Sequence, residues 1–242
     1  MNAIEVKDLH IEYKALKRTS VKQAFFSLYR TKVKIFEAIR GVTFNIKKGE
    51  ILGVIGKNGS GKSTLLRALA GIFAPNAGTI NRFGNSVALL SMGVGFKNNL
   101  SGRENIYLSG LLMGYSLNQI RDKIDEIIEF SELGDFIDMP VKTYSSGMHS
   151  KLAFSITAIM EADVILVDEV LSVGDAKFKK KSYKKMKDLI TDESKTVVLV
   201  SHSMDMIRKL CNRVIWLDDG KIVMQGTPDE VIKAYEDTYG KD

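Results

Sequence analysis

Residues 56–63 read Gly-Lys-Asn-Gly-Ser-Gly-Lys-Ser and match the phosphate-binding pattern G-x-x-x-x-G-K-[ST]. The pattern follows an apolar run at 51–55, which is typical of a buried strand, and precedes residues 64–70, whose apolar spacing is typical of a helix. Its glycines let backbone N–H groups converge on an anion at the positive end of that helix. The sequence therefore predicts a nucleotide phosphate site formed by Gly56, Lys57, Asn58, Gly59, Ser60, Gly61, Lys62, Ser63 and Thr64.

The composition is that of an ordinary globular chain. Its 242 residues are 45% hydrophobic, enough for one large domain or two small ones, and no uncharged apolar run approaches the length of a membrane span. The N-terminus carries charges where a secretory signal needs an apolar stretch, so we expect the chain to stay in the cytoplasm. One cysteine, Cys211, excludes an internal disulfide, and we expect it to be a buried bystander.

The net charge of +6 is concentrated in one segment. Seven bases and no acid lie from Lys14 to Lys34, interleaved with the apolar residues Phe25, Phe26, Leu28 and Tyr29. This combination is typical of an interfacial amphipathic helix, and the alternatives are a solvated loop with packed aromatics and a nucleic-acid arm. A second basic cluster, at 177–187, is interpreted as a solvated helix face.

Two further apolar runs, at 164–167 and 196–200, resemble the strand before the phosphate loop. Continuous β-branched runs of this kind are typical of strands covered on both faces of a parallel sheet. Asp168 and Glu169 follow the first run, and His202 follows the second. Because the carboxyl ends of parallel strands share one edge, these groups and the phosphate loop should border one crevice.

These side chains suit phosphoryl transfer. Lys62 would neutralise phosphate charge, and Ser63 and Asp168 are the predicted protein ligands of Mg²⁺, the carboxylate acting through water. Glu169 would polarise the attacking water. A neutral His202 could bridge that water and a terminal phosphate oxygen, which makes Glu169 and His202 the predicted catalytic residues.

Helical character dominates residues 101–160. Capping boxes, in which the first and fourth side chains satisfy exposed helix N–H groups, are predicted at Ser101 and Ser116. Nearer the C-terminus, the pattern predicts a hairpin that turns at 219–220 and a last helix from Pro228.

A second anion site is predicted at Ser145, Ser146 and Gly147. These residues come at the expected start of a helix, where backbone N–H groups have no partner within the helix. The phosphate loop already supplies one anion site, so two sites for one nucleotide suggest a shared interface.

These motifs, in this order and spacing, resemble those of the ATP-binding cassette family over nearly the whole chain. They are the phosphate loop, the signature Tyr-Ser-Ser-Gly-Met, the run Val-Ile-Leu-Val-Asp-Glu and the switch His202. The resemblance implies an α/β P-loop NTPase with a mainly parallel sheet, N-terminal antiparallel strands and a helical subdomain. It also implies one nucleotide-binding domain over 1–242, divided into a core at 1–100 and 161–242, a helical signature subdomain at 101–160 and a basic insertion at 14–35.

In that family two cassettes pack head to tail, so the signature of one covers the nucleotide of the other. By resemblance, Ser145, Ser146 and Gly147 would contact the nucleotide in trans, and Asp175 belongs to the loop that links the two sites. Tyr13 fits the aromatic that stacks on adenine, with Phe36 as a competing candidate.

Two departures from the family pattern are informative. The usual signature is Leu-Ser-Gly-Gly-Gln, and residues 90–96 lack the glutamine that usually contacts Mg²⁺, for which Ser91 is a weak substitute. The same departures resemble the exporters of teichoic acid, O-antigen and capsular polysaccharide. In those exporters a basic amphipathic insertion between the first two strands lies at the cytoplasmic membrane surface, which is where residues 14–35 fall.

The resemblance thus implies an ATPase that uses ATP and Mg²⁺ to drive a separate polytopic permease exporting a lipid-linked polysaccharide, at the cytoplasmic face of the cell membrane. Residues 14–35 would meet anionic lipid or the pyrophosphate of the glycan carrier. The alternatives are an exporter of another substrate, a non-catalytic regulator, and a soluble cassette ATPase acting on nucleic acid or ribosomes. Glu169 and His202 argue against the regulator. The soluble enzymes usually pair two cassettes or insert a long coiled coil, so we expect no nucleic-acid partner.

Overall fold

A six-stranded sheet organises the chain. The computed structural model describes residues 1–15, 34–90, 95–168 and 175–240. The strand order is β5-β6-β7-β3-β8-β9, in which β9 alone runs antiparallel to its neighbour. Its strands are β3 (Ile51–Ile55), β5 (Val87–Leu90), β6 (Val164–Asp168), β7 (Thr196–Val200), β8 (Arg213–Asp218) and β9 (Lys221–Gly226). The predicted parallel strands and the C-terminal hairpin are confirmed.

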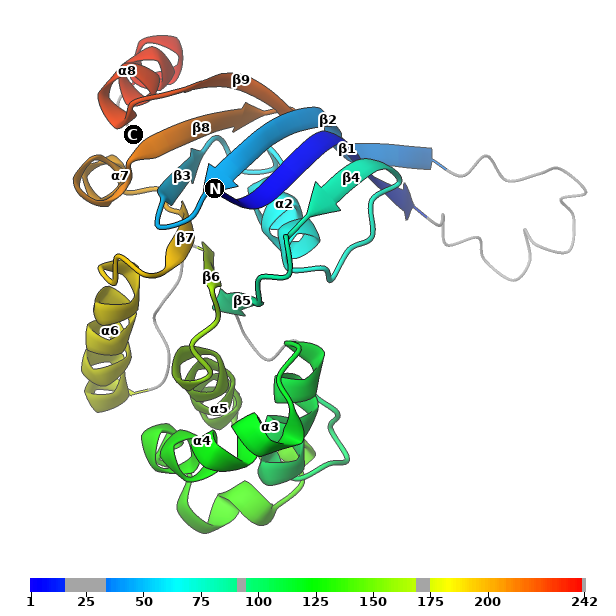
Figure 1. Cartoon of the computed structure of the whole chain (residues 1–242), viewed down its shortest axis with the longest axis vertical. Helices are drawn as coiled ribbons and strands as arrows, with labels where there is room; N and C mark the ends of the chain where they lie inside the picture. Colours follow the sequence, from blue (N-terminus) through cyan, green and yellow to red (C-terminus); the bar gives the residue numbers. More distant parts are fainter. Residues whose placement is uncertain (16–33, 91–94, 169–174, 241–242) are drawn as a thin grey trace, which may run out of the picture.

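A second, antiparallel sheet lies beside the first (Figure 1). It contains β1 (Asn2–Ala15), β2 (Lys34–Lys47) and β4 (Ala77–Asn81), in the order β2-β1-β4. Ala15 and Lys34 are register partners, so β1 and β2 stay paired to the ends that flank residues 16–33. The predicted basic insertion at 14–35 lies mostly outside the described residues, as do Ser91 and Glu169.

Helices complete the fold, and some of them form a separate group below the sheets (Figure 1). That group contains α3 (Gly102–Leu112), α4 (Leu117–Ser131) and α5 (Ser146–Ile159), with short 3₁₀ turns at Gly134–Asp138 and Val141–Thr143. Both predicted capping boxes are present, at Ser101 and Ser116. The others are α2 (Lys62–Leu69), α6 (Ala176–Ile190), α7 (Met204–Leu210) and α8 (Pro228–Tyr239). Of the helices in the described ranges, none combines the length and hydrophobicity that a membrane crossing requires.

Buried apolar side chains of the described residues form three clusters. One fills the space between the two sheets and α2, a second lies between the central sheet and α6, α7 and α8, and a third lies within the helical group. Cys211 belongs to the second, and burial raises the pKa of its thiol to about 12. The expected burial of Cys211 is confirmed, and a thiol with that pKa is not ionised near neutral pH.

The two sheets are joined by a nearly buried ion pair. Glu50 is 9% exposed and accepts hydrogen bonds from Arg213 Nε at 2.7 Å and from the Lys47 backbone N–H at 2.6 Å. Arg213 also donates to the backbone carbonyl of Asn45 in β2. One guanidinium therefore links β2, β8 and the residue that precedes β3.

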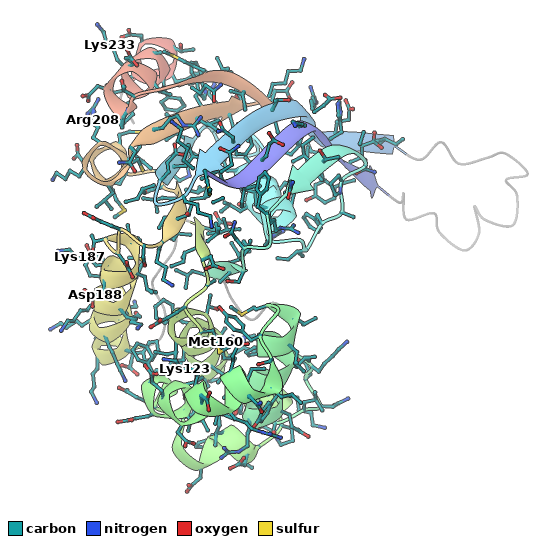
Figure 2. The ribbon with its side chains drawn as sticks, in the orientation of Figure 1. Lys123, Met160, Lys187, Asp188, Arg208 and Lys233 are labelled. Atoms are coloured by element: carbon teal, nitrogen blue, oxygen red, sulfur yellow. The ribbon has the colours of Figure 1, made fainter. Side chains whose placement is uncertain are left out.

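Arg213→Met is expected to lower the free energy of unfolding by about 3 kcal/mol, since it leaves the Glu50 carboxylate buried without its cation. Chemical denaturation measures the change. Arg208→Met is the matched control: that side chain lies on the surface near Asp229 and Glu236 and should cost less than about 1 kcal/mol (Figure 2). Equal losses in the two variants would contradict the structural role of Arg213.

Candidate functional site

The phosphate loop connects β3 to α2 and has a shape that requires glycine. Gly56 has φ 150°, and a Cβ there would lie 2.0 Å from the carbonyl oxygen of Leu217. Gly61 has φ 107°, and a Cβ there would lie 2.6 Å from the carbonyl oxygen of Ala38. Both positions therefore exclude any side chain, and the loop backbone packs directly on β2 and β8.

A backbone junction at Gly220 holds the phosphate loop in place through main-chain hydrogen bonds. The Gly220 N–H donates to the Ser60 carbonyl at 3.0 Å, and the Arg40 N–H donates to the Gly220 carbonyl at 2.8 Å. The turn between β8 and β9 thus bridges the phosphate loop and β2. The position of the loop is set by main-chain hydrogen bonds from both sheets.

Lys62 is held inside the loop that it follows. It is 7% exposed, and its ammonium donates to the carbonyl oxygens of Gly56 at 2.6 Å and Lys57 at 2.9 Å. An ammonium has three N–H groups, so one of them has no acceptor among the described residues and is available to a phosphate oxygen. Burial lowers the pKa of Lys62, and the charge of Asp168 partly offsets this. The carboxylate that ends β6 is therefore electrostatically coupled to the phosphate-loop lysine.

An unpartnered hydroxyl also fits an anion at this loop. Ser60 is 2% exposed, and its Oγ has no hydrogen-bond partner among the described residues. A buried hydroxyl without a partner costs free energy, which a ligand acceptor or donor would recover. Together with the glycine cradle and the free donor of Lys62, it shows that the loop suits a phosphate group.

The predicted catalytic groups follow neighbouring strands. Asp168 ends β6 in register with Val200, the last residue of β7, and His202 follows two residues later. Because β3, β6 and β7 are parallel, Asp168, His202 and the phosphate loop lie at the same edge of the sheet, as predicted. Glu169 lies outside the described residues, and its catalytic role remains a prediction.

Tyr13 and Phe36 occupy one surface beside the loop. They are register partners on β1 and β2, so their side chains share a face. The Tyr13 hydroxyl lies 3.0 Å from Thr64 Oγ1, at hydrogen-bond distance, and the Tyr13 ring packs edge-on against Phe73 at 5.7 Å. Phe36 is 51% exposed. The structure therefore attaches Tyr13 to the phosphate loop and leaves Phe36 as its exposed neighbour.

The signature residues lie at the start of α5, in the helical group and apart from α2 (Figure 1). Ser145 is the N-cap, and its Oγ accepts a hydrogen bond from the Met148 N–H at 3.2 Å. A Cβ added at Gly147 would meet nothing closer than Ser145 Oγ at 3.8 Å. Ser146 and Gly147 thus stand in the open first turn of a helix, where backbone N–H groups can meet an anion.

Asp175 is tied to that same helix by a residue that the sequence did not single out. Its carboxylate caps α6 through the Lys177 and Phe178 N–H groups and accepts from Lys151 Nζ of α5 at 2.6 Å. The Lys151 hydrogen bond and these N–H groups lower the pKa of Asp175 to about 2. No local pattern marks Lys151, because its partner lies 24 residues later.

An apolar groove separates the sheets from the helical group. It has a volume of about 250 Å³ and is lined by residues that include Ile72, Val87, Phe96, Ser109, Leu112 and Ile156. Leu112 is 66% exposed, and Ser109 Oγ is buried without a hydrogen-bond partner among the described residues. The groove thus combines exposed apolar surface with one polar atom that lacks a partner.

Comparison with known proteins agrees with this geometry. Residues 39–172 match the family model described as ABC transporter. The chain is 51% identical over 203 residues to a teichoic acids export ATP-binding protein of Lactococcus lactis and 44% identical over 203 residues to an O-antigen export system ATP-binding protein of Myxococcus xanthus. Both alignments cover 84% of this chain, but only 43% and 46% of the two relatives, so the chain spans about half of their length.

Other comparisons cover more of the related protein's length. An O-antigen export system ATP-binding protein of Klebsiella pneumoniae is 41% identical, with 89% of this chain and 86% of the relative aligned. Among solved structures, an ATP-binding subunit of an ABC transporter has a TM-score of 0.69 at 20% identity, over 96% of this chain and 93% of the other. A dimeric ATP-binding cassette with bound ADP and phosphate has a TM-score of 0.66 at 22% identity, over 93% and 98%. These two structures establish the fold.

Proposed function

This chain belongs to the ABC transporter family, and from that premise we propose that it is the ATP-binding and ATP-hydrolysing subunit of a polysaccharide exporter. The observation that carries the proposal is the geometry of the phosphate loop: two of its glycines leave no room for side chains, and the Lys62 ammonium is held by two loop carbonyls at 2.6 and 2.9 Å, at the same sheet edge as Asp168. Positioned charges and donors of this kind supply most of the catalysis in phosphoryl transfer.

Each residue has a proposed part in hydrolysis. Lys62 and the loop N–H groups neutralise phosphate charge. Ser63 and Asp168 would hold Mg²⁺, which would supply further positive charge to the phosphate. Glu169 orients and deprotonates the attacking water. His202, one residue before the cap of α7, contacts the terminal phosphate and reports its presence.

The nucleotide site is proposed to be complete only in a head-to-tail pair of chains. Ser145, Ser146 and Gly147 of one copy would contact the terminal phosphate held by the other, and Asp175 would lie between the two sites. The ion pair between Lys151 and Asp175 supports this, since it fixes the signature helix and the start of α6 as one unit.

Tyr13 is proposed to stack on the adenine. Tyr13→Ala should weaken ATP binding by about tenfold, because base–aromatic stacking contributes about 1–3 kcal/mol. Phe36→Ala removes the neighbouring ring and is the matched control, with an expected change below about threefold. Titration with a fluorescent ATP analogue measures both. A larger loss at Phe36 would transfer the stacking role to that residue.

We propose that the partner is a membrane permease and that it binds in the apolar groove between the sheets and the helical group. The proposal follows from relatives named as ATP-binding proteins of export systems and from the exposed apolar surface around Leu112. Residues 14–35 are proposed to meet anionic lipid or the lipid-linked glycan at the same membrane surface. The chain would then lie at the cytoplasmic face of the membrane.

Leu112→Glu should reduce co-purification with a polytopic membrane protein by at least about tenfold, because it buries a charge in an apolar contact. ATP hydrolysis by the isolated subunit should persist. Leu117→Glu is the control, since Leu117 is 47% exposed but does not line the groove. If the wild-type chain fractionates with ribosomes or nucleic acid instead of membranes, the exporter proposal fails.

A further inference from the structure

Helix α6 presents a strongly basic surface. The helix contains seven lysines and one acid, Asp188 (Figure 2). Three of the lysines lie near acids: Lys177 and Lys181 near Glu132 at the end of α4, and Lys185 near Glu161 in the connection from α5 to β6. The other four have no acidic partner within 4.0 Å among the described residues; they are Lys179, Lys180, Lys184 and Lys187.

Three of these four form a straight row. Lys180, Lys184 and Lys187 are spaced four and three residues apart, so they lie above one another on one side of the helix, about 5–6 Å between neighbouring Cβ atoms. Lys177 continues the row toward the N-terminus, for a total length of about 15 Å. Like charges at this spacing repel, and a stable helix with such a row favours an anion that bridges it.

The row borders an aromatic side chain and an open hollow. Tyr183 is 54% exposed and lies within one helical turn of Lys180 and Lys187. Lys177, Lys180, Lys181 and Lys184 line a shallow hollow along the helix. Cations in series beside an exposed ring suit a polymer that alternates anionic groups with carbon segments.

A lipid surface does not suit this helix. An interfacial helix must insert its apolar face, but Phe178, Met186 and Leu189 are buried in the core beneath α6. The exposed side of α6 presents charged side chains and one aromatic ring. These can bind along a flexible polymer without insertion into a membrane. The anion that fits is therefore the linear, hydrated part of a polymer rather than a membrane surface.

We propose that Lys180, Lys184 and Lys187 bind the phosphodiester groups of a polyol-phosphate polymer while it is being exported. This rests on the proposed export function and refines it: the substrate would be of the teichoic acid class, whose repeats each carry a phosphate, rather than a neutral glycan. The row would hold the polymer against the cassette through charge and would leave the nucleotide site untouched.

The test uses the whole chain and a fluorescently labelled glycerol-phosphate oligomer, with binding followed by anisotropy at several salt concentrations. The triple variant Lys180→Gln, Lys184→Gln, Lys187→Gln should bind at least about tenfold more weakly at low salt, and the slope of log K against log salt should fall by about two. The matched control is Lys209→Gln, Lys221→Gln, Lys233→Gln, which removes the same charge from lysines outside α6. All three are exposed, and Lys233 is labelled in Figure 2. The control variant should change binding by less than threefold.

Several results would overturn the proposal. They are equal losses in the two triple variants, wild-type binding no tighter than to a neutral dextran oligomer, and equally tight binding of an RNA oligonucleotide of the same charge. If the first triple variant loses its cooperative melting transition, Lys184→Gln alone takes its place, with Lys233→Gln as control. ATP hydrolysis is measured on the same samples. Normal hydrolysis without polymer binding refutes this inference alone, whereas absent hydrolysis in the wild type refutes the proposed function.

Discussion

Glu169→Gln is expected to lower the rate of ATP hydrolysis by about 10²- to 10⁴-fold, because the amide cannot accept the proton of the attacking water. Binding should remain, since the change is isosteric and keeps the phosphate loop, Lys62 and Asp168 intact. ATP-driven dimers should therefore accumulate, as hydrolysis no longer takes them apart. Steady-state phosphate release measures the first effect, and gel filtration with ATP and Mg²⁺ measures the second.

The control for this variant is Glu161→Gln. Glu161 lies between α5 and β6, at the opposite end of β6 from Glu169; it is at the surface near Lys185 and takes no part in the site. Its substitution should leave turnover within about twofold, as surface changes usually do. Undiminished turnover in Glu169→Gln would show that Glu169 is not the catalytic base, and His202 would then be the remaining candidate.

Two inactive variants are expected to restore each other's activity when mixed. Lys62→Ala removes the phosphate-loop ammonium, and Gly147→Asp places a carboxylate where the terminal phosphate of the other copy would bind. Each alone should lose about 10²- to 10³-fold in turnover, the usual cost of a lost or opposed charge at the reacting group. A mixed dimer, however, has both defects in one site and none in the other. An equimolar mixture should regain about a quarter of wild-type activity by random pairing.

The structure makes Gly147→Asp a clean test. Space is open at this position, with the nearest atom 3.8 Å from an added Cβ, so the variant should fold normally. Gly147→Ala is its control and should retain most activity, since it adds a methyl group at the same position but no charge. If mixed dimers form but stay inactive, the signature does not act on the partner's nucleotide.

Much of this architecture could be predicted because its signals are local. The strand before Gly56, the run that ends in Asp168 and the capping boxes at Ser101 and Ser116 are each written within a few consecutive residues. Parallel strands then bring their carboxyl ends to one edge without further information. For this reason the sequence alone predicts that Asp168, His202 and the phosphate loop lie at one place.

Other contacts could not be predicted, because they join residues far apart in the chain. The Lys151–Asp175 pair and the contact of Tyr13 with Thr64 depend on how α5 meets α6 and how β1 passes α2. The sequence marked Gly220 only as a hairpin turn, yet it also bonds to the phosphate loop. A repeating apolar pattern specifies which face is buried, but it does not specify which distant backbone atom that face will meet.

The backbone junction at Gly220 has a mechanical consequence. Arg40 lies on β2, the strand that follows the basic segment. Its backbone N–H donates to the Gly220 carbonyl, and the Gly220 N–H donates to the Ser60 carbonyl, so a single residue connects β2 to the phosphate loop. Main-chain hydrogen bonds of this kind carry displacement but no net charge. A shift of the paired strands β1 and β2 would therefore be passed through Gly220 to the backbone of the phosphate loop, and neither salt nor pH should weaken this transmission.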